Sequence, residues 1–336
     1  MKRIDIVRQI LAGKNSSTQI KVGQAFAPTN IALCKYWGKR NGEINLPMTA
    51  SLSISLGDKG ATTTIAEIAA ASDQIVLNQQ PVDIKSAFGA RLCGFLDLFR
   101  PTPATRYHVE TQMNIPVAAG LASSACGFAA LVLALDHLYV WRLDPQALSV
   151  LARLGSGSAA RSLWQGFVEW REGVAADGMD SHGVLLPEQW PELRVGLHLL
   201  NTQQKPLSSR DAMQRTVETS QLYSAWPAQV RADMPALKRA IAAKDFARLG
   251  QVAEANALAM HATMMSAWPP VVYSQPETVA AMRQVWQLRA DGVPVYFTQD
   301  AGPNLKLLFL ADAGGAIQTV FPNLQVCLPF SRHGKG

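Results

Sequence analysis

The sequence has few cysteines and no long hydrophobic run. Four cysteines occur in 336 residues, and none forms a CxxC pair or a Cys/His cluster with zinc spacing. This argues against a disulfide framework and favours reduced thiols in a cytoplasmic protein. No segment approaches the roughly 20 apolar residues of a membrane span, and the first twenty residues are too polar for a signal peptide. We therefore expect a cytoplasmic chain without a membrane partner.

The chain also lacks strong charge, repeats and linkers. Its 31 basic and 25 acidic residues give a formal charge of +6, a mild excess that suits anionic ligands. No Lys/Arg cluster with interleaved aromatics is present, which argues against a nucleic-acid partner. The six histidines show no metal spacing, so no protein-only metal site is expected. With 48% hydrophobic residues, the chain has the composition of one large globular domain or two smaller ones.

Periodicity predicts strands in the first half and helices in the second. Alternation with period two predicts a hairpin of residues 51–56 and 61–68 around a Gly-Asp-Lys-Gly turn. Other expected strands lie in 19–37 (with a turn at Ala27-Pro28), 73–83, 106–116, 166–173, 193–201 and 294–312. Expected helices are 86–100, the segment after Ser124, 144–164, 209–225, 233–243, 245–265 and 275–291. An α+β class follows.

Residues 116–135 read PVAAGLASSACGFAALVLAL, in which very small residues precede an apolar helix. Glycine and alanine let the backbone approach a ligand closely. Free amides and the positive end of the helix dipole favour an anion at such a helix start. The GxxxxGK[ST] lysine of a Walker loop is absent. On this stretch alone, a phosphate-binding loop and a simple serine N-cap are both open interpretations.

Three further stretches decide between these interpretations, and a fourth supports them. They are APTNIALCKYWGKRNGEINLPMTASLSISL (27–56), GSGSAARSLWQGFVEW (155–170), FTQDAGPN (297–304) and KPLSSRDAMQRTVETS (205–220). Together with PVAAGLASSACGFAAL, they resemble the motifs of the diphosphomevalonate decarboxylases, members of the GHMP small-molecule kinase superfamily. The resemblance keeps the family's motif order and runs from about residue 24 to 312.

This resemblance implies the α+β GHMP kinase fold. The N-terminal half, residues 20–200, would have a ribosomal-protein-like βαβ core and carry the nucleotide. The helix-rich C-terminal half, residues 201–330, would close over the substrate, with the active site in the cleft between the halves. Members of the family are commonly homodimers, so we expect a homodimer.

The resemblance also implies the reaction. With ATP and Mg²⁺ carried on the nucleotide, the family phosphorylates the 3-hydroxyl of mevalonate 5-diphosphate. Phosphate and CO₂ then leave, giving isopentenyl diphosphate and ADP. A 3-kinase, a phosphomevalonate decarboxylase and a binding-only relative remain open alternatives. Lys35 and Asp300 argue for decarboxylation, while Tyr36, Lys39 and Arg210 argue for the diphosphate.

Residue roles follow by motif. Asp300 matches the family's catalytic aspartate, although Asp-Ala-Gly-Pro also favours a turn. Lys35 matches the lysine beside it, and Arg161 the arginine that holds the substrate carboxylate. The other implied catalytic residues are Asn30 and Ser209, and the diphosphate pocket would use Tyr36, Lys39, Ser156, Ser158 and Arg210. ATP would lie on Ala119, Gly120, Leu121, Ala122, Ser123 and Ser124.

Two departures from the family pattern lie next to these residues. Gln299 stands where the family commonly has Phe, and it could tune the surroundings of Asp300. Cys34 replaces a usual aliphatic residue beside Lys35. Because Cys34 lies next to Lys35, we hypothesise that its thiol makes the enzyme sensitive to thiol reagents.

Overall fold

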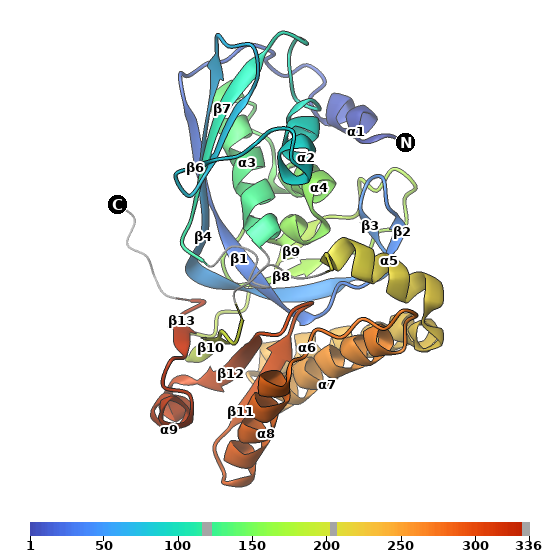
Figure 1. Cartoon of the computed structure of the whole chain (residues 1–336), viewed down its shortest axis with the longest axis vertical. Coiled ribbons are helices and arrows are strands. Elements are labelled where there is room, and N and C mark those ends of the chain that lie inside the picture. The colour runs from blue at the N-terminus through green and yellow to red at the C-terminus, as the bar shows by residue number, and fades with distance from the viewer. Residues whose placement is uncertain (116–122, 202–206, 331–336) are drawn as a thin grey trace.

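The N-terminal half is built on a mixed β-sheet, and the computed structural model describes residues 1–115, 123–201 and 207–330. The strand order is β6-β5-β7-β4-β8-β9, with β1 paired along β4 (Figure 1). The strands are β1 (Gly23–Cys34), β4 (Ser51–Ile68), β5 (Gln74–Leu77), β6 (Gln80–Pro81), β7 (Arg106–Met113), β8 (Phe167–Trp170) and β9 (Gly183–Leu185). A small hairpin of β2 (Lys39–Asn41) and β3 (Leu46–Pro47) follows β1.

One helix of the N-terminal half is largely buried. Helix α3 (Ser123–Tyr139) packs on β1 and β4 and is apolar on nearly all sides, as expected for a core helix. Around it lie α1 (Arg3–Ile10), α2 (Ala87–Leu96), α4 (Pro145–Gly155) and the 3₁₀ helix η1 (Gly157–Arg161). Asp144 caps α4, where its side chain accepts from the Ala147 amide at 2.8 Å.

The C-terminal half has its own four-stranded sheet, with strand order β11-β12-β10-β13. Its strands are β10 (Leu193–His198), β11 (Val295–Gln299), β12 (Leu305–Leu310) and β13 (Gln325–Cys327). Its helices are α5 (Ser209–Thr219), η2 (Gln221–Ala225), α6 (Trp226–Ala243), α7 (Phe246–Met265), α8 (Pro276–Ala290), η3 (Ala311–Ala313) and α9 (Gly314–Val320). The predicted α+β class is confirmed.

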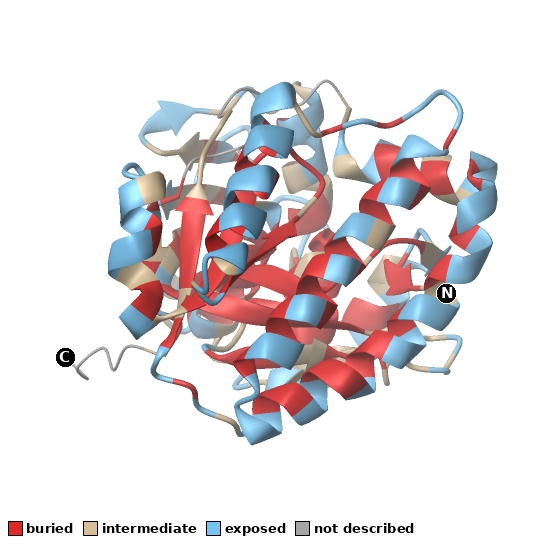
Figure 2. Ribbon diagram, turned by 90° about the horizontal axis from the view of Figure 1, so that it is seen from below, coloured by how far each residue is buried: buried red, intermediate tan, exposed pale blue. Residues whose placement is uncertain are grey.

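The two halves share one hydrophobic core. A single cluster of buried apolar side chains contains Ile31 of β1, Leu237 of α6 and Leu308 of β12. Helices α6 and α7 both pack against β1. Figure 2 shows buried residues continuing from these helices into the sheets behind them. The end of β1 is therefore fixed from both halves.

Two local predictions were wrong. Residues 51–68 form the single strand β4 instead of a hairpin, and residues 23–34 form the single strand β1. The cause is tertiary pairing, since β1 runs along β4 and the register shifts at Pro28 absorb the Gly-Asp-Lys-Gly segment as a bulge. In the described sheet β1 pairs with β4 alone, so the missing amide of Pro28 is tolerated.

The first twenty residues, for which the sequence predicted no element, are folded onto the body. Ile6 and Val7 of α1 are buried in the core. The following segment reaches the C-terminal end of α3. Lys14 Nζ donates to the Trp141 carbonyl at 3.0 Å, and Trp141 Nε1 donates to the Asn15 carbonyl at 2.8 Å. These contacts satisfy groups just beyond the helix end.

Candidate active site

Lys35 and Asp300 form a buried ion pair where the two halves meet. Lys35 follows β1, and Asp300 begins the turn after β11. Lys35 Nζ lies 2.7 Å from Asp300 Oδ1 and also donates to the Ala32 carbonyl at 2.8 Å. Burial lowers the pKa of Lys35 to about 8, although Asp300 opposes the shift. Burial alone would raise the pKa of Asp300, but Lys35 and Lys306 outweigh it and hold it well below its usual range.

Lys306 is a second cation on the same carboxylate, and the sequence analysis missed it. Its side chain is 0% exposed, and its Nζ lies 3.3 Å from Asp300 Oδ2. A lysine in the otherwise apolar strand LKLLFL was the available signal, because buried charges need partners.

Helix α7 holds the backbone of both members of the pair. Asn256 Oδ1 accepts from the Lys35 amide at 2.8 Å. His261 Nε2 lies 3.2 Å from the Asp300 main-chain oxygen, so Nε2 carries the proton. Burial lowers the pKa of His261 to about 4, which keeps the ring neutral at physiological pH. Neither residue could be found from motifs, because both act on main-chain atoms.

Arg161 is buried nearby without a carboxylate partner among the described residues. Its guanidinium donates to Ser51 Oγ and, at 3.4 Å, to Asn30 Oδ1, while its Nε has no hydrogen-bond partner within the described ranges. Burial lowers the pKa of Arg161 to about 10. Asn30 is held in turn, since its Nδ2 donates to Ser162 Oγ at 2.7 Å. A buried, incompletely satisfied guanidinium is suited to an incoming carboxylate.

Three serine hydroxyls form a row between the start of α3 and η1. Ser124 Oγ lies 3.3 Å from Ser156 Oγ, and Ser156 Oγ lies 3.3 Å from Ser158 Oγ. The structure thus joins the two serine-containing motifs of the sequence. Ser123 begins α3 beside them. Ala119, Gly120, Leu121 and Ala122 lie outside the described residues.

Lys39 belongs to a group of cations, one of which, Arg210, also acts on Tyr36. Lys39 Nζ donates to Asn45 Oδ1 at 2.7 Å, and burial, then Arg210 and Arg91, lower the pKa of Lys39 to about 8. Arg91 of α2 donates to the Gly155 carbonyl at 2.7 Å and was missed because α2 carries no recognised motif. The Tyr36 hydroxyl is buried without a hydrogen-bond partner in the part of the chain that the structure describes, and burial raises the pKa of Tyr36. These groups together favour a polyanion.

Ser209 and Arg210 lie in the first turn of helix α5, which Ser208 caps by accepting from the Asp211 amide at 3.2 Å. Arg210 is exposed, but its charge acts on Lys39, Arg91 and Tyr36. The role of Ser209 near the reacting hydroxyl stays a prediction.

The two departures from the family pattern have clear surroundings. Gln299 is buried and donates to the Gly302 carbonyl at 2.9 Å, so it braces the turn that holds Asp300. Cys34 is fully buried, and burial raises the pKa of its thiol, although Asn256 donates to its sulfur at 3.6 Å. The expected sensitivity of Cys34 to thiol reagents is therefore wrong on physical grounds, because the thiolate is the reactive form.

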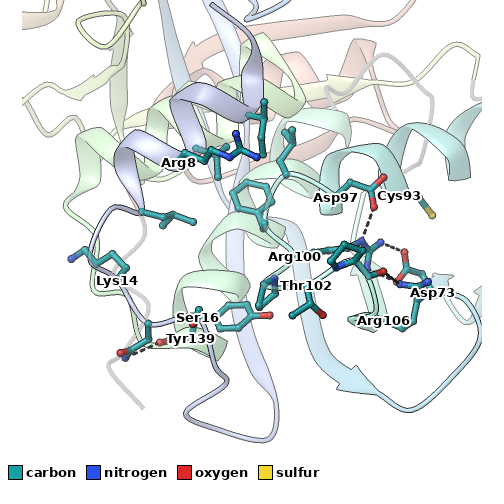
Figure 3. Close-up of a pocket in the computed structure, with 18 of the residues that line it drawn as sticks. Arg8, Lys14, Ser16, Asp73, Cys93, Asp97, Arg100, Thr102, Arg106 and Tyr139 are labelled. Carbon is teal, nitrogen blue, oxygen red and sulfur yellow. Dashed lines mark hydrogen bonds and ion pairs between the residues drawn. The ribbon is translucent and has the colours of Figure 1, made fainter.

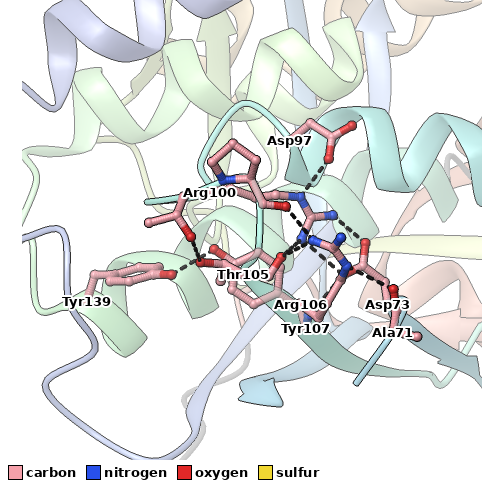
Figure 4. A network of polar contacts seen from close by, with 10 residues as sticks. Ala71, Asp73, Asp97, Arg100, Thr105, Arg106, Tyr107 and Tyr139 are labelled. Atoms are coloured by element: carbon pink, nitrogen blue, oxygen red, sulfur yellow. Dashed lines mark hydrogen bonds and ion pairs between the residues drawn. The ribbon is translucent and has the colours of Figure 1, made fainter. Parts of the chain in front are cut away.

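A cavity of about 900 Å³ lies elsewhere, between α1 and the loop after α2 (Figure 3). Its central cation, Arg100, is already neutralised by Asp73 and by Asp97 at 2.6 Å and donates to the Thr105 carbonyl at 2.7 Å (Figure 4). The cavity contains none of the residues of the Lys35–Asp300 site. A satisfied network of this kind stabilises a loop more readily than it binds a ligand.

Within the described ranges, no group of three or more His, Cys, Asp or Glu side chains could hold a metal ion. None of the helices in these ranges is both long and apolar enough to cross a membrane.

Comparison with known families finds matches over almost the whole chain. Residues 27–183 match the family model described as the diphosphomevalonate decarboxylase-like N-terminal domain. Residues 196–331 match that of the mevalonate 5-diphosphate decarboxylase C-terminal domain. The chain is 39% identical over 305 residues to the diphosphomevalonate decarboxylase of Aspergillus fumigatus, covering 84% of this chain and 76% of that protein. It is 38% identical over 307 residues to the human enzyme, covering 85% and 76%.

Solved structures agree in shape. The mevalonate diphosphate decarboxylase of Enterococcus faecalis superposes with a TM-score of 0.85 at 41% identity, covering 92% of this chain and 96% of that chain. The Staphylococcus aureus enzyme gives a TM-score of 0.85 at 35% identity, covering 91% and 95%. A structure described as MDDEF in complex with MVAPP, AMPPCP and magnesium gives 0.86 at 41% identity, covering 92% and 96%. The expected fold is confirmed.

Proposed function

Because this chain belongs to the diphosphomevalonate decarboxylase family, we propose that it converts mevalonate 5-diphosphate and ATP to isopentenyl diphosphate, ADP, phosphate and CO₂. One observation carries the proposal at the level of residues. The Lys35–Asp300 pair lies beside Arg161, a buried cation without a carboxylate partner among the described side chains. Such a site can hold a hydroxyl and a carboxylate of one substrate at the same time.

The first step is phosphorylation of the tertiary 3-hydroxyl. Asp300 would accept a hydrogen bond from this hydroxyl and orient its oxygen toward the γ-phosphorus of ATP. Lys35 would offset the charge that develops on the transferring phosphoryl group. Asn30 and Ser209 would complete the surroundings of the reacting oxygen. The low pKa of Asp300 favours orientation of the hydroxyl over early removal of its proton.

The second step breaks a carbon–carbon bond. The 3-phosphate leaves C3 with the electron pair of the C–O bond. The bond between C2 and the carboxylate carbon then breaks, and its electron pair forms the C2–C3 double bond while CO₂ departs. Arg161 would hold the carboxylate in the required orientation through its fork of N–H donors.

The substrate diphosphate would bind in the group of cations around Tyr36. Lys39, Arg210, Ser156 and Ser158 would donate to its oxygens, together with the unpartnered Tyr36 hydroxyl. Arg91 extends this set, because its guanidinium is electrostatically coupled to Arg210 and Lys39. No described carboxylate forms an ion pair with Lys39 or Arg91, so the positive charge is available to the ligand.

ATP would lie at the start of α3. Its phosphates would meet the amides and side chains of Ala119, Gly120, Leu121, Ala122, Ser123 and Ser124. The row of serine hydroxyls and the surplus of cations fit a triphosphate. Mg²⁺, bound to the phosphates, would neutralise charge and hold them in place for transfer. The donor set fits a metal carried on the nucleotide, since Asp300 is already paired with two lysines.

Three broader proposals accompany this one. Residues 20–200 would form the nucleotide-binding domain and residues 201–330 the domain that closes over the substrate. A cytoplasmic location is supported by the four cysteines, all of which are free. A homodimer is supported by family membership, and the exposed side chains Met265, Trp268 and Val272 offer an apolar surface for it.

A product assay tests the proposed function. Purified protein is incubated with magnesium-ATP and, separately, mevalonate, its 5-phosphate and its 5-diphosphate, while ADP and CO₂ are measured together. Equal release of both with the diphosphate is expected. ADP without CO₂ would make the protein a 3-kinase, and turnover only with the monophosphate would make it a phosphomevalonate decarboxylase. No turnover with any of the three would favour a binding-only relative.

A further inference from the structure

Lys306 is an unusual residue for its position. It lies in β12, a central strand of the C-terminal sheet, opposite Thr298 of β11 and Leu197 of β10. The other residues of this strand are apolar, and the Lys306 side chain is 0% exposed. Placing an ammonium group in such a strand is unfavourable unless a partner compensates for the lost hydration. Packing alone therefore does not explain a lysine at position 306.

Its partner is the carboxylate that the reaction would use. Lys306 Nζ lies 3.3 Å from Asp300 Oδ2, while Lys35 Nζ lies 2.7 Å from Oδ1. The same ammonium donates to the Asn304 carbonyl at 3.3 Å, which fixes it to the turn that follows Asp300. One oxygen of the carboxylate thus pairs with Lys35, just after β1, and the other with Lys306 of β12.

The other charged or titratable groups facing Asp300 do not replace Lys306. Arg161 of η1 contributes at longer range, without an ion pair to Asp300. His261 of α7 is neutral and contacts only the Asp300 main-chain oxygen. Lys35 remains, and in the proposed reaction it faces the transferring phosphoryl group. A cation outside the path of that group can hold Asp300 throughout the reaction.

We propose that Lys306 is a positioning residue that fixes the Asp300 carboxylate and keeps it ionised independently of Lys35. This inference rests on the proposed function, because it assigns Lys306 a part in orienting the 3-hydroxyl. It leaves Lys35 free to turn toward phosphate while Asp300 keeps its place. Lys306 itself touches neither reacting atom.

The test compares K306M with K306R, and uses L307M as a matched control. Leu307 is the next residue of β12 and packs in the core of the C-terminal sheet, so this change disturbs packing without altering charge. The pH dependence of kcat is measured between pH 4.5 and 9 from ADP and CO₂ release. A direct readout is the ¹³C carboxyl signal of Asp300 in the ligand-free protein, identified by its absence in D300N.

For K306M we expect the pKa of Asp300 to rise, because an adjacent opposite charge typically lowers a carboxyl pKa by one to three units. Lys35 still keeps that pKa low, so Asp300 stays ionised between pH 4.5 and 9 and the loss is one of positioning. The kcat at pH 7 should fall about tenfold or more, with KM little changed. K306R should restore most of kcat and most of the low pKa, and L307M should leave both unchanged. If K306M does not fold, K306Q replaces it, since its amide can still donate to the Asn304 carbonyl.

An Asp300 signal with the same chemical shift at pH 7 and the same titration at acid pH in wild type, K306M and K306Q would overturn the proposal. So would a loss of kcat that K306R does not reverse and that is matched by an equal rise in KM, which indicates a merely structural role. The NMR titration needs no substrate. A wild-type protein that releases no CO₂ from the diphosphate would therefore refute the proposed function while the effect of Lys306 on Asp300 is still measured.

Discussion

Lys35 and Asp300 lie 2.7 Å apart although 265 positions separate them in the sequence. Their contact depends on both halves, because β1 delivers Lys35 and the turn after β11 delivers Asp300. Helix α7 fixes the main chain of each, through Asn256 and His261. The packing of α7 between the two halves therefore positions the Lys35–Asp300 pair. We expect substitutions in this part of α7 to lower activity even where the protein still folds.

Replacing Asp300 with Asn should lower kcat by about 100-fold or more, the scale of a positioned proton acceptor. It should also lower the melting temperature of the ligand-free protein, because Lys35 and Lys306 are left buried without a counter-charge. Product assays and thermal unfolding measure the two effects. The exposed change D312N is the control and should alter neither. Near-normal turnover in D300N would remove Asp300 from the mechanism.

Replacing Arg161 with Met should separate activity from stability. Substrate affinity and turnover should both fall, because the carboxylate loses its partner. The melting temperature without ligand should stay the same or rise, since a buried guanidinium without a carboxylate is costly. R153M is the matched comparison. Arg153 is also buried without an ion pair among the described residues, but its guanidinium donates to the main-chain carbonyls of Gly178, at 2.6 Å, and Ser181. Its loss would leave these two buried carbonyls without that donor and should lower the melting temperature. Unchanged kinetics in R161M would refute its carboxylate role.

Lys35 and Lys39 should contribute stability that increases with pH between about 8 and 9.5. The thiols contribute in the opposite direction, because their raised pKa values keep protons that the unfolded chain loses, so the effect of the lysines is the difference between wild type and K35M. The pKa of Lys35 falls from 10.5 to about 8 on folding, and that of Lys39 does the same. In this window the unfolded chain binds more protons than the folded chain, so raising the pH favours the folded state. Below pH 8 both lysines are charged in the folded and in the unfolded state, so they add no pH dependence to the stability. Urea unfolding at pH 7, 8, 9 and 9.5 measures the slope, which K35M should reduce. An identical slope in K35M would contradict the assignment.

Alkylation should spare Cys34. Its thiol is fully buried with a raised pKa, whereas Cys93 is only half-buried. Under native conditions we expect iodoacetamide to modify Cys93 first and to leave activity intact until the protein unfolds. Peptide mass spectrometry over time, with and without substrate, gives the order of modification. Early labelling of Cys34 that substrate prevents would show an accessible active-site thiol instead.

Deleting residues 1–19 should lower stability without removing the reactive pair. The deletion exposes the core under Ile6 and Val7 and removes the contacts of Lys14 and Asn15 with Trp141. Burial of two aliphatic side chains alone contributes about 3 to 6 kcal/mol. Chemical unfolding of the shortened chain measures the loss. An unchanged midpoint would mean that this segment does not pack in solution as described.

Sequence motifs were a better guide to which segments meet in the fold than local periodicity was to the individual strands and helices. Ser124, which follows the small-residue stretch, lies 3.3 Å from Ser156 of the GSGS motif, so two motifs that are far apart in the sequence meet in the fold. The hairpin at 51–68 failed because a turn-forming tetrapeptide was overridden by pairing along β1, which no local pattern reveals. Helix α1 was missed because it has only 8 residues, of which only Ile6 and Val7 are buried, so its periodic signal is short.

The supporting residues escaped prediction for another reason. Arg91, His261 and Lys306 come from elements that carry no motif, and they matter only through distances across the fold. A lone buried lysine in an apolar strand was a usable sign for Lys306. No comparable sign existed for His261, whose contact is to a carbonyl of the backbone.

The shared hydrophobic core has a consequence for dividing the chain. Because Ile31, Leu237 and Leu308 belong to one cluster, neither half could keep its apolar surface from water if expressed alone. Two fragments cut near residue 200 should be aggregation-prone apart, yet each would present a complementary face to the other. Their reassociation would bring Lys35 back to Asp300, so recovered turnover could serve as a sensitive reporter of fragment complementation.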